Sequence, residues 1–252
     1  MIVDMHAHIN TGERYLKKSS SGAVRNLISQ MDKTGVDVCA INQLTDDMIL
    51  DNDAVYKAAR AYSNRLVPFA HINPGMYCNE GEKASAEIDR ALGKLKMKGV
   101  KLHPEFDHFQ MFDEVMNELL EKIQEYGVPI LFHSGGSFST PLEIVYVAKN
   151  FPRIPVLLGH MGTDSFVHEA VPAAKLSENI YLETSIGAQL LFIENAVHEL
   201  GAERIVWGTD FPYGSPPVEL KKIQTLDISE KQKRMILGEN ARRMLGLKTR
   251  SA

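Results

Sequence analysis

Histidines that follow short apolar segments are the residues of this sequence best suited to chemistry. His6 and His8 stand near the N-terminus in the motif Asp-Met-His-Ala-His. Because side chains two residues apart on a β-strand point to the same side, these two imidazoles can face one cavity. Six further polar residues lie at the ends of later apolar segments: His71, Lys101, His103, His133, His160 and Asp210. Imidazole and carboxylate groups gathered at one end of a sheet predict a metal site.

A set of four side chains could bind a single divalent cation: His6, His8, His133 and Asp210. They supply three neutral nitrogens and one anionic oxygen, and a catalytic cation keeps a further position open for water. Zinc is the ion that we expect first, with manganese and iron as alternatives that accept the same ligands. Such an ion would lower the pKa of water toward about 7, which makes hydroxide available at neutral pH.

Apolar segments alternate with segments of helical periodicity along the whole chain, which is typical of βαβ units. Eight strands are expected, over residues 2–8, 36–42, 66–72, 99–103, 129–133, 155–160, 180–183 and 205–208. The helices between them include 82–96 and 112–126. Right-handed crossovers leave few topologies, so we predict an α/β fold, a single-domain (β/α)₈ TIM barrel over residues 1–252. An open doubly wound sheet is the alternative, but no Gly-x-Gly-x-x-Gly motif follows the first strand.

Composition excludes several classes of function. The 252 residues are 44% hydrophobic and carry a formal net charge of -4 without long charged blocks, so we expect binding to neither nucleic acid nor membrane. Two cysteines form no disulfide framework, which favours a reducing cytoplasm. The chain shows neither a leader pattern nor an apolar run of about 18 residues, and we therefore expect a soluble, unprocessed protein.

Five strand-end motifs occur in a characteristic order. They are Asp-Met-His-Ala-His at 4–8, Gly-Val-Lys-Leu-His-Pro at 99–104, Pro-Ile-Leu-Phe-His-Ser-Gly at 129–135, Leu-Gly-His-Met-Gly at 158–162 and Gly-Thr-Asp-Phe-Pro at 208–212. This order resembles the amidohydrolase superfamily, in particular its amidohydrolase-related group of metal-dependent TIM-barrel hydrolases and decarboxylases. The segment 236–247 is similar to the closing helix of that group, so the resemblance spans nearly the whole chain.

The resemblance implies a role for each matching residue. His6, His8 and His133 would bind the metal, and Asp210 would bind the metal or its water and act as the general base. His160 would act as an acid or polarise the substrate. One ion is favoured over two, because members of this group are more often mononuclear.

Lys101 and His103 share a face of the fourth expected strand, and we expect both to contact the substrate. In dihydroorotase-like members of the superfamily, a lysine in a similar setting is carboxylated and bridges two metals. The alternative is a lysine that pairs inside the barrel or faces an acidic group of the substrate. We also expect the loop over 11–21 to fold over the cavity as a lid.

The leading hypothesis is a metal-dependent hydrolase that uses metal-activated water on an amide, ester or lactone of a small molecule. The alternative is a metal-dependent nonoxidative decarboxylase of a small aromatic or unsaturated carboxylic acid. Decarboxylation needs a cation to hold the acid, and the absence of arginine from the strand ends favours hydrolysis. A barrel without catalysis is a third reading, but every expected ligand position is filled. The expected partner is a small-molecule substrate, and barrels of this type frequently form homodimers.

Overall fold

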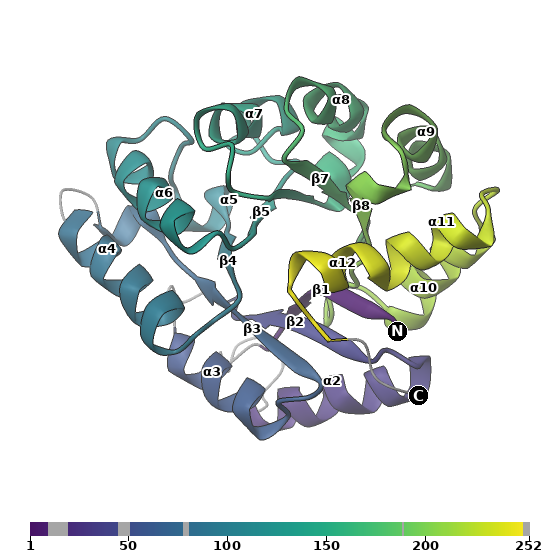
Figure 1. Cartoon of the computed structure of the whole chain (residues 1–252), viewed down its shortest axis with the longest axis horizontal. Coiled ribbons are helices and arrows are strands. Elements are labelled where there is room, and N and C mark those ends of the chain that lie inside the picture. The colour runs from purple at the N-terminus through teal and green to yellow at the C-terminus, as the bar shows by residue number, and fades with distance from the viewer. Residues whose placement is uncertain (10–19, 45–50, 78–80, 188, 249–252) are drawn as a thin grey trace.

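Eight parallel strands lie side by side in chain order, and helices alternate with them. The computed structural model describes residues 1–9, 20–44, 51–77, 81–187 and 189–248. The strands are β1 (Val3–His8), β2 (Val38–Asn42), β3 (Leu66–His71), β4 (Gly99–Leu102), β5 (Ile130–His133), β6 (Val156–Gly159), β7 (Ile180–Glu183) and β8 (Ile205–Val206). Figure 1 shows the helices as a ring outside these strands. The predicted (β/α)₈ barrel is therefore confirmed.

Hydrogen bonds between the first and last strands nearly close the sheet. The N–H of Met5 donates to the carbonyl oxygen of Trp207 at 3.0 Å, and the N–H of His8 donates to that of Phe211 at 2.6 Å. A parallel bridge also pairs Ala7 with Phe211. Closure brings the C-terminal end of β1 next to the segment that follows β8, and with it two of the motifs that are most distant in the sequence.

The pairing of β1 with β2 is irregular where the first ligand candidates lie. Asp4 pairs with Cys39 and Ala7 with Ile41, so β1 advances by one residue more than β2 does. A bulge of this kind turns side chains in a new direction and is frequent beside active sites. His6 lies within the bulge and is fully buried.

Eleven α-helices are found in the described part of the chain. They are α2 (Ser20–Thr34), α3 (Asn52–Ala61), α4 (Gly81–Ile88), α5 (Pro104–Asp107), α6 (Glu114–Tyr126), α7 (Pro141–Asn150), α8 (Thr163–Leu176), α9 (Leu190–Leu200), α10 (Pro216–Thr225), α11 (Glu230–Arg234) and α12 (Asn240–Met244). The 3₁₀-helices are η1 (Pro74–Tyr77), η3 (His160–Gly162) and η4 (Ala202–Arg204), and the π-helices are η2 (Asp89–Lys94) and η5 (Met235–Glu239). None of the described helices has both the length and the apolar character that a membrane span needs.

Two helix boundaries differ from the expected ones. The helix expected over 82–96 is divided into α4 and the π-helical η2, where Gly93 and Asp89 pack against Tyr126 of α6 and the tyrosine hydroxyl donates to Asp89 at 2.5 Å. The helix expected over 112–126 begins only at Glu114, because the backbone of Asp113 is extended. The loop expected as a lid, 11–21, lies almost entirely outside the described residues.

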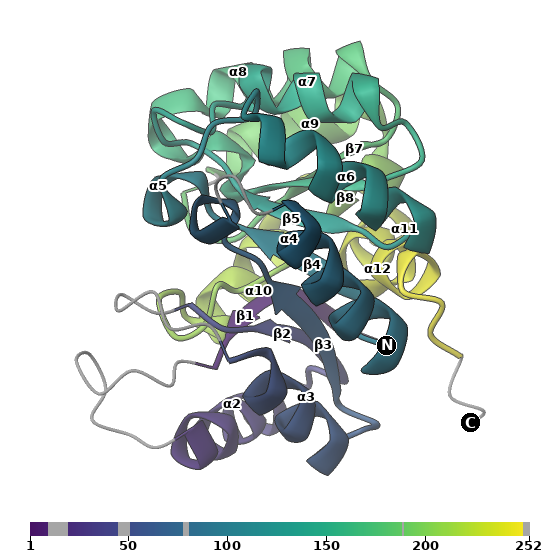
Figure 2. The same cartoon turned by 90° about the vertical axis from the view of Figure 1, so that its left-hand side faces the viewer.

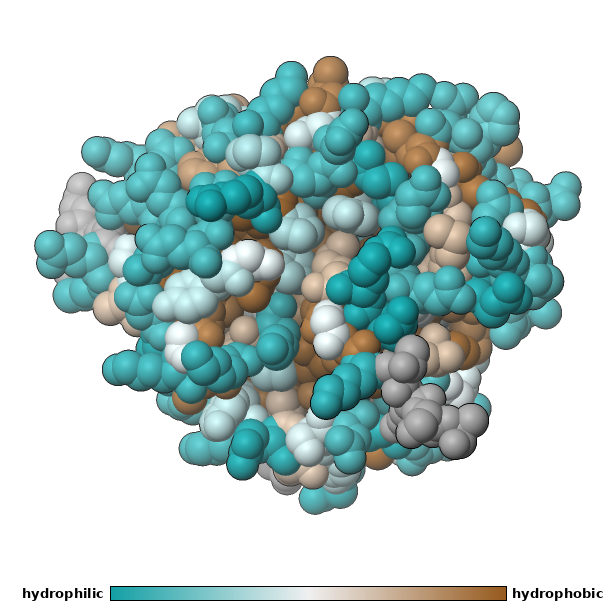
Figure 3. Space-filling view, in the orientation of Figure 1, coloured by the Kyte–Doolittle hydropathy of each residue, from teal (hydrophilic) through white to brown (hydrophobic). Residues whose placement is uncertain are grey.

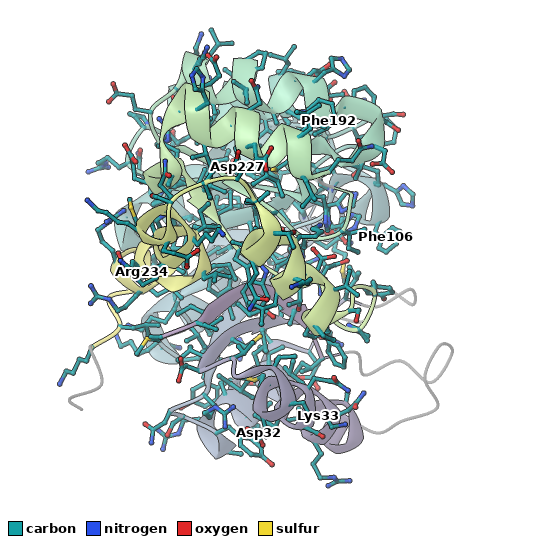
Figure 4. All side chains as sticks on the ribbon, turned by 90° about the vertical axis from the view of Figure 1, so that its right-hand side faces the viewer. Asp32, Lys33, Phe106, Phe192, Asp227 and Arg234 are labelled. Carbon is teal, nitrogen blue, oxygen red and sulfur yellow. The ribbon has the colours of Figure 1, made fainter. Side chains whose placement is uncertain are left out.

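The two ends of the barrel differ in character. Inside the barrel, an apolar cluster packs against α12: Val3, Met5, Val38, Ala40, Val67, Phe69, Leu131, Leu157, Val206, Ala241 and Leu245. Figure 2 shows α12 and the N-terminus at one end of the molecule and α5 at the other, and Figure 4 shows Arg234 and Phe106 at these same opposite ends. The face that carries α12 is mainly hydrophilic on its surface (Figure 3). With one end of the barrel filled by apolar side chains, the polar candidates lie at the other.

Candidate metal centre and active site

Six of the eight polar residues expected from the sequence line a cavity of about 170 Å³ at the C-terminal ends of the strands, and His71 does not. Its lining consists of His8, Leu44, Lys101, His103, Phe106, His133, His160, Asp210 and Tyr213. His6 lies immediately beside it and is completely buried. The convergence of strand ends that the sequence predicted is therefore present in the fold.

Glu183, at the end of β7, holds the imidazole of His6 in place. Its Oε2 lies 2.9 Å from Nδ1 of His6. The same carboxylate accepts hydrogen bonds from the backbone N–H of Ser185 at 2.7 Å, the hydroxyl of Ser185 at 2.8 Å and the backbone N–H of His160 at 3.2 Å. With Nδ1 of His6 directed at Glu183, Nε2 is the nitrogen that remains for a metal, as in the carboxylate–histidine–metal arrangement of many metalloenzymes.

Asp210 joins the two histidines of β1. Its Oδ1 lies 2.7 Å from Nε2 of His8 and 3.2 Å from Nε2 of His6. Burial acts to raise the pKa of Asp210, but the hydrogen bond with His8 and the attraction of neighbouring groups, among them the Lys101 ammonium, outweigh burial, so the net shift is downward. Asp210 is therefore an ionised, buried oxygen donor at neutral pH.

The backbone at two of the candidate catalytic residues is left-handed. Asp210 has a φ of 53° and His160 a φ of 63°. Residues other than glycine rarely adopt this conformation, and such residues cluster at active sites and ligand-binding turns, where the surrounding structure holds them. The hydrogen bond from the Asp210 N–H to the carbonyl oxygen of His6, at 2.6 Å, is one such constraint.

A divalent cation fits the cluster of His6, His160 and Asp210. These residues offer ligand atoms that all lie within 4.8 Å of one another, and all three are buried. Nδ1 of His8 is a buried nitrogen without a hydrogen-bond partner in the structure, so this imidazole is only half satisfied by the protein. Two nitrogens and a carboxylate oxygen are donors that zinc, manganese and iron all accept.

The structure brings His160, which was expected to act on the substrate, closer to the candidate metal ligands His6 and Asp210 than the sequence suggested. The ring of His133 stacks on His103, with centroids 4.0 Å apart, and meets the ring of His160 edge to face at 4.9 Å. The ring of His160 also lies 5.0 Å from that of His6, so His160 is in contact with both His133 and His6. The ligand set of His6, His8, His133 and Asp210 stays a prediction, and the geometry adds His160 to the candidates.

Lys101 is a buried cation next to the candidate metal ligands. Its Nζ lies 3.2 Å from Nε2 of His6, and the residue is 1% exposed. Burial lowers the pKa of Lys101 to about 8, although the nearby carboxylates of Asp210 and Glu183 oppose this shift. Lys101 is the only lysine or arginine among the described residues that line the cavity.

His103 forms the centre of a stack of three rings. Phe106 lies on one side, with centroids 4.2 Å apart and planes inclined by 5°, and His133 lies on the other. Nδ1 of His103 accepts a hydrogen bond from the backbone N–H of Phe106 at 3.3 Å, so the neutral ring carries its proton on Nε2. Burial lowers the pKa of His103 far below its ordinary value, which keeps this ring neutral.

Burial also keeps the other imidazoles of the cluster uncharged. It lowers the pKa of His160 to about 4, and it lowers the pKa values of His6, His8 and His133 as well. Neutral imidazoles have the lone pairs that a metal needs. The site therefore presents neutral nitrogens to a cation at physiological pH.

Three groups in the active-site region were not identified from the sequence. Glu183 and Ser185 are fully buried and orient His6 and His160. Asp4 accepts hydrogen bonds from the N–H and hydroxyl of Thr209 and from the N–H of His6, which ties β1 to the segment after β8. Glu183 could have been identified from the sequence, since it ends an expected strand, whereas Asp4 lies near the start of β1 and gives no such signal.

The loop after β5 is tied to its neighbouring βα loops by hydrogen bonds. The N–H of Phe138 and the hydroxyl of Ser139 donate to the carboxylate of Glu105, at 3.0 and 2.8 Å. Ser134 donates to the carbonyl oxygen of Gly159 at 2.6 Å. These donors thus hold neighbouring βα loops together.

Fold and site together define a class of protein, namely barrel enzymes with a histidine–carboxylate cluster for a divalent cation at the C-terminal ends of the strands. The chain belongs to the amidohydrolase family, whose model matches residues 3–247. The resemblance inferred from the strand-end motifs is thereby confirmed.

Three proteins similar to this chain are decarboxylases. Decarboxylase orsB of Emericella nidulans is 24% identical over 219 residues, which are 64% of this chain and 65% of that protein. The 5-carboxyvanillate decarboxylase LigW from Sphingomonas paucimobilis is 17% identical, with a TM-score of 0.75 over 98% of this chain and 99% of that one. A dihydroxybenzoic acid decarboxylase from Polaromonas sp. JS666, solved with manganese and the inhibitor 2-nitroresorcinol, is 16% identical, with a TM-score of 0.76 over 98% and 97%.

The expectation of a hydrolase is contradicted by these comparisons, because the named relatives are decarboxylases. The lack of arginine at the strand ends was a poor guide, since Lys101 already provides a buried cation beside the cavity. Zinc gains no specific support either, as one of these structures holds manganese.

Proposed function

We propose that this protein is a metal-dependent nonoxidative decarboxylase of a small aromatic or unsaturated carboxylic acid. The observation that carries the proposal is the cavity itself, in which the cation Lys101 and the imidazole–carboxylate cluster face the same small space. The activities of the named relatives support the same reaction class. The substrate would be a small molecule.

The size of the cavity supports a substrate of about one ring. A cavity of about 150 Å³ is large enough for benzene, and this one measures about 170 Å³. Phe106 and Tyr213 contribute aromatic surface, and Leu44 adds an apolar patch. Flat apolar walls beside a few polar groups are typical of sites that bind a substituted ring.

Several groups of the chain would hold a cation. His6, His160 and Asp210 would bind it, with His8 and His133 as the further ligand candidates. When bound, the ion supplies positive charge that attracts oxygen atoms of the substrate and draws electron density from them. Manganese and zinc are the first ions to test.

Lys101 would orient the acid. A carboxylate entering the cavity is attracted by the ammonium group, which burial has removed from competing water. Nζ of Lys101 has the imidazole of His6 at 3.2 Å as a hydrogen-bond partner, and the carboxylates of Asp210 and Glu183 attract its charge. A substrate carboxylate in the cavity would add a negatively charged partner in direct contact with Lys101.

The reaction replaces a carboxylate by a hydrogen atom. The bond between the substrate carbon and the carboxyl carbon breaks, its electron pair stays on the substrate carbon, CO₂ leaves, and that carbon takes up a proton. Asp210 is our candidate to hold and deliver this proton, because its Oδ1 lies 2.7 Å from Nε2 of His8 and borders the cavity. His160, whose Nδ1 faces the hydroxyl of Ser185 at 3.0 Å, would orient the substrate.

The test uses the full chain loaded with Mn²⁺ or Zn²⁺ and a panel that includes 2,6-dihydroxybenzoate and 5-carboxyvanillate. We expect CO₂ release from at least one acid and, in D₂O, one deuterium on the carbon that lost the carboxylate. The double variant His6→Ala, His8→Ala should lose both metal and activity, whereas His198→Asn, at an exposed position, should keep both. A metal-loaded protein that releases no CO₂ from a broad panel of aromatic and unsaturated acids would contradict the proposal.

A further inference from the structure

His71 and Asp107 form a buried pair that the proposed reaction does not use. His71 ends β3, and Asp107 is the last residue of α5. Nε2 of His71 lies 2.8 Å from Oδ2 of Asp107, and the two side chains are 2% and 5% exposed. Neither residue lines the cavity, so a contact this well shielded from water calls for another role.

The second nitrogen of His71 also faces an acceptor. Nδ1 lies 2.7 Å from the carbonyl oxygen of Gln43, the residue after β2. A carbonyl oxygen can only accept a hydrogen bond, so Nδ1 carries a proton. The contact with Asp107 needs a second proton between Nε2 and Oδ2, which we place on Nε2 because a carboxylic acid is a stronger acid than an imidazolium. A neutral histidine has only one N–H and satisfies one of these contacts, whereas an imidazolium satisfies both.

The pair holds a helix that is too short to be stable alone. Helix α5 spans only Pro104–Asp107, and a single turn of helix has no intrinsic stability in water. Its residue Phe106 lines the cavity and stacks on His103. A displacement of α5 would therefore move the aromatic wall of the substrate cavity.

A second contact holds α5 from the opposite side. Glu105 accepts hydrogen bonds from the hydroxyl of Ser139 at 2.8 Å and from the N–H of Phe138 at 3.0 Å, both in the loop after β5. The helix is thus fixed between β3 on one side and the β5 loop on the other. Loss of either contact removes one of the two side-chain anchors that fix the helix to its neighbouring elements.

The other charged groups around the pair come from three elements. Lys101 of β4 pairs with His71 in the strand register, Glu105 lies on α5, and Glu87 of α4 accepts a hydrogen bond from Asn52 at 2.9 Å. Asn52 in turn bonds both backbone groups of His71, which fixes the position of the ring. Asp107 is the carboxylate in direct contact with the ring.

We propose that His71 is an imidazolium paired with the Asp107 carboxylate, and that this pair positions α5 and with it the Phe106–His103 wall of the substrate cavity. His71 and Asp107 are thus positioning residues for the reaction proposed above. The link to catalysis rests on that proposed function, whereas the charge state of His71 and the anchoring of α5 do not.

The first test reads the charge state directly and needs no substrate. In ¹⁵N-histidine-labelled wild-type protein at neutral pH, both ring nitrogens of His71 should show the chemical shifts of protonated nitrogens, with His71→Gln used to assign the signals. A ring with one unprotonated nitrogen would overturn the proposal. Failure of the decarboxylase assignment would leave this measurement unaffected.

The second test separates the two contacts of the ring. Glutamine in His71→Gln can place an N–H near the position of Nε2 and so keep the bond to Asp107, whereas asparagine in His71→Asn reaches only as far as Nδ1. We expect amide exchange over residues 104–109 to rise roughly tenfold in His71→Asn and Asp107→Asn, and to change little in His71→Gln. His198→Asn, at an 85% exposed side chain, is the matched control. Equal exchange in all of these variants would overturn the anchoring role.

The third readout concerns the reaction. For whichever acid the wild-type protein decarboxylates, KM should rise roughly tenfold in His71→Asn with kcat and metal content changed far less, because the cavity wall and not the metal cluster is displaced. His71→Gln should restore most of the KM. A fall in kcat with an unchanged KM would contradict the positioning role, even if the exchange results hold.

Discussion

Oε2 of Glu183 lies 2.9 Å from Nδ1 of His6, and this contact decides which nitrogen of His6 is available to a metal. The carboxylate is itself oriented by the N–H and hydroxyl of Ser185 and by the N–H of His160. Each of these groups donates a hydrogen bond to an oxygen of Glu183. If glutamine replaced Glu183, its NH₂ group would take the place of one oxygen and would face a donor.

We therefore expect Glu183→Gln to weaken the binding of Mn²⁺ or Zn²⁺ by roughly 10–100-fold, the usual effect of removing such an outer partner. Competition with a chelator of known affinity measures the change. Glu178→Gln, an exposed glutamate shortly before β7, serves as the control. Equal affinity in the two variants would show that the carboxylate does not support the metal ligand.

Buried titratable groups should make the stability of the metal-free protein depend on pH. Burial lowers the pKa of His160 to about 4, so the unfolded chain binds the proton more readily, and the free energy of unfolding falls as the pH drops from about 6.5 toward 4. Burial raises the pKa of Asp4 to about 7 and that of Glu183 to about 8. These two groups hold protons that the unfolded chain has already lost, so they reduce the free energy of unfolding as the pH rises from their ordinary values, 3.8 and 4.5, through 7 and 8.

Above pH 6.5 the two carboxyl groups dominate, so the Tm of the metal-free protein should fall between about pH 6.5 and 8. Above about pH 8 the lowered pKa of Lys101, about 8, acts in the opposite direction and counteracts this fall. Glu183→Gln has no titrating group at this position, so its Tm should fall less over the same interval. Calorimetry in the presence of a chelator measures both curves. Parallel curves for the wild type and the variant would contradict the shift assigned to Glu183.

How much of the site the sequence could predict depends on where each residue lies along its strand. His6 and His8 lie at the C-terminal end of β1, and Asp210 lies in the segment that follows β8. Closure of the barrel makes these two parts of the chain neighbours, so Asp210 contacts both histidines. The order of the strands followed from the alternation of apolar and helical segments. The sequence pattern could not show that the ring of His160 contacts both His133 and His6, since His160 follows β6 in a left-handed backbone conformation that the pattern does not reveal.

The reaction class was harder to predict from the sequence than the fold. Hydrolysis and decarboxylation can use the same metal ligands, and the difference lies in the other groups that face the cavity. No arginine lies at the ends of the described strands, and the cation beside the cavity is Lys101, whose burial and contact with His6 become visible only in three dimensions. The anchoring of α5 by His71 was likewise hidden, since His71 and Asp107 are 36 residues apart.

Lys101 should govern the affinity for the substrate acid. Lys101→Met keeps the length of the side chain but removes the charge, so we expect kcat/KM for an aromatic acid to fall roughly 100-fold or more, mainly through KM. Lys98→Met, at an exposed position just before β4, is the matched control. Steady-state assays of CO₂ release would detect the difference. Unchanged KM in Lys101→Met would mean that the substrate carboxylate is held by other groups.

Asp210 should matter more for the proton than for the metal. Asp210→Asn keeps the size of the side chain and one oxygen, but an amide cannot take up and return a proton, so kcat should fall roughly 10²–10⁴-fold. Metal affinity should fall less than in His6→Ala, because the histidine ligands remain. Asp227→Asn, at an exposed aspartate, should behave like the wild type. The decisive measurement is deuterium uptake in D₂O from single turnovers: if Asp210→Asn protonates the substrate carbon as fast as the wild type does, the proton comes from another group, and His160 becomes the next candidate.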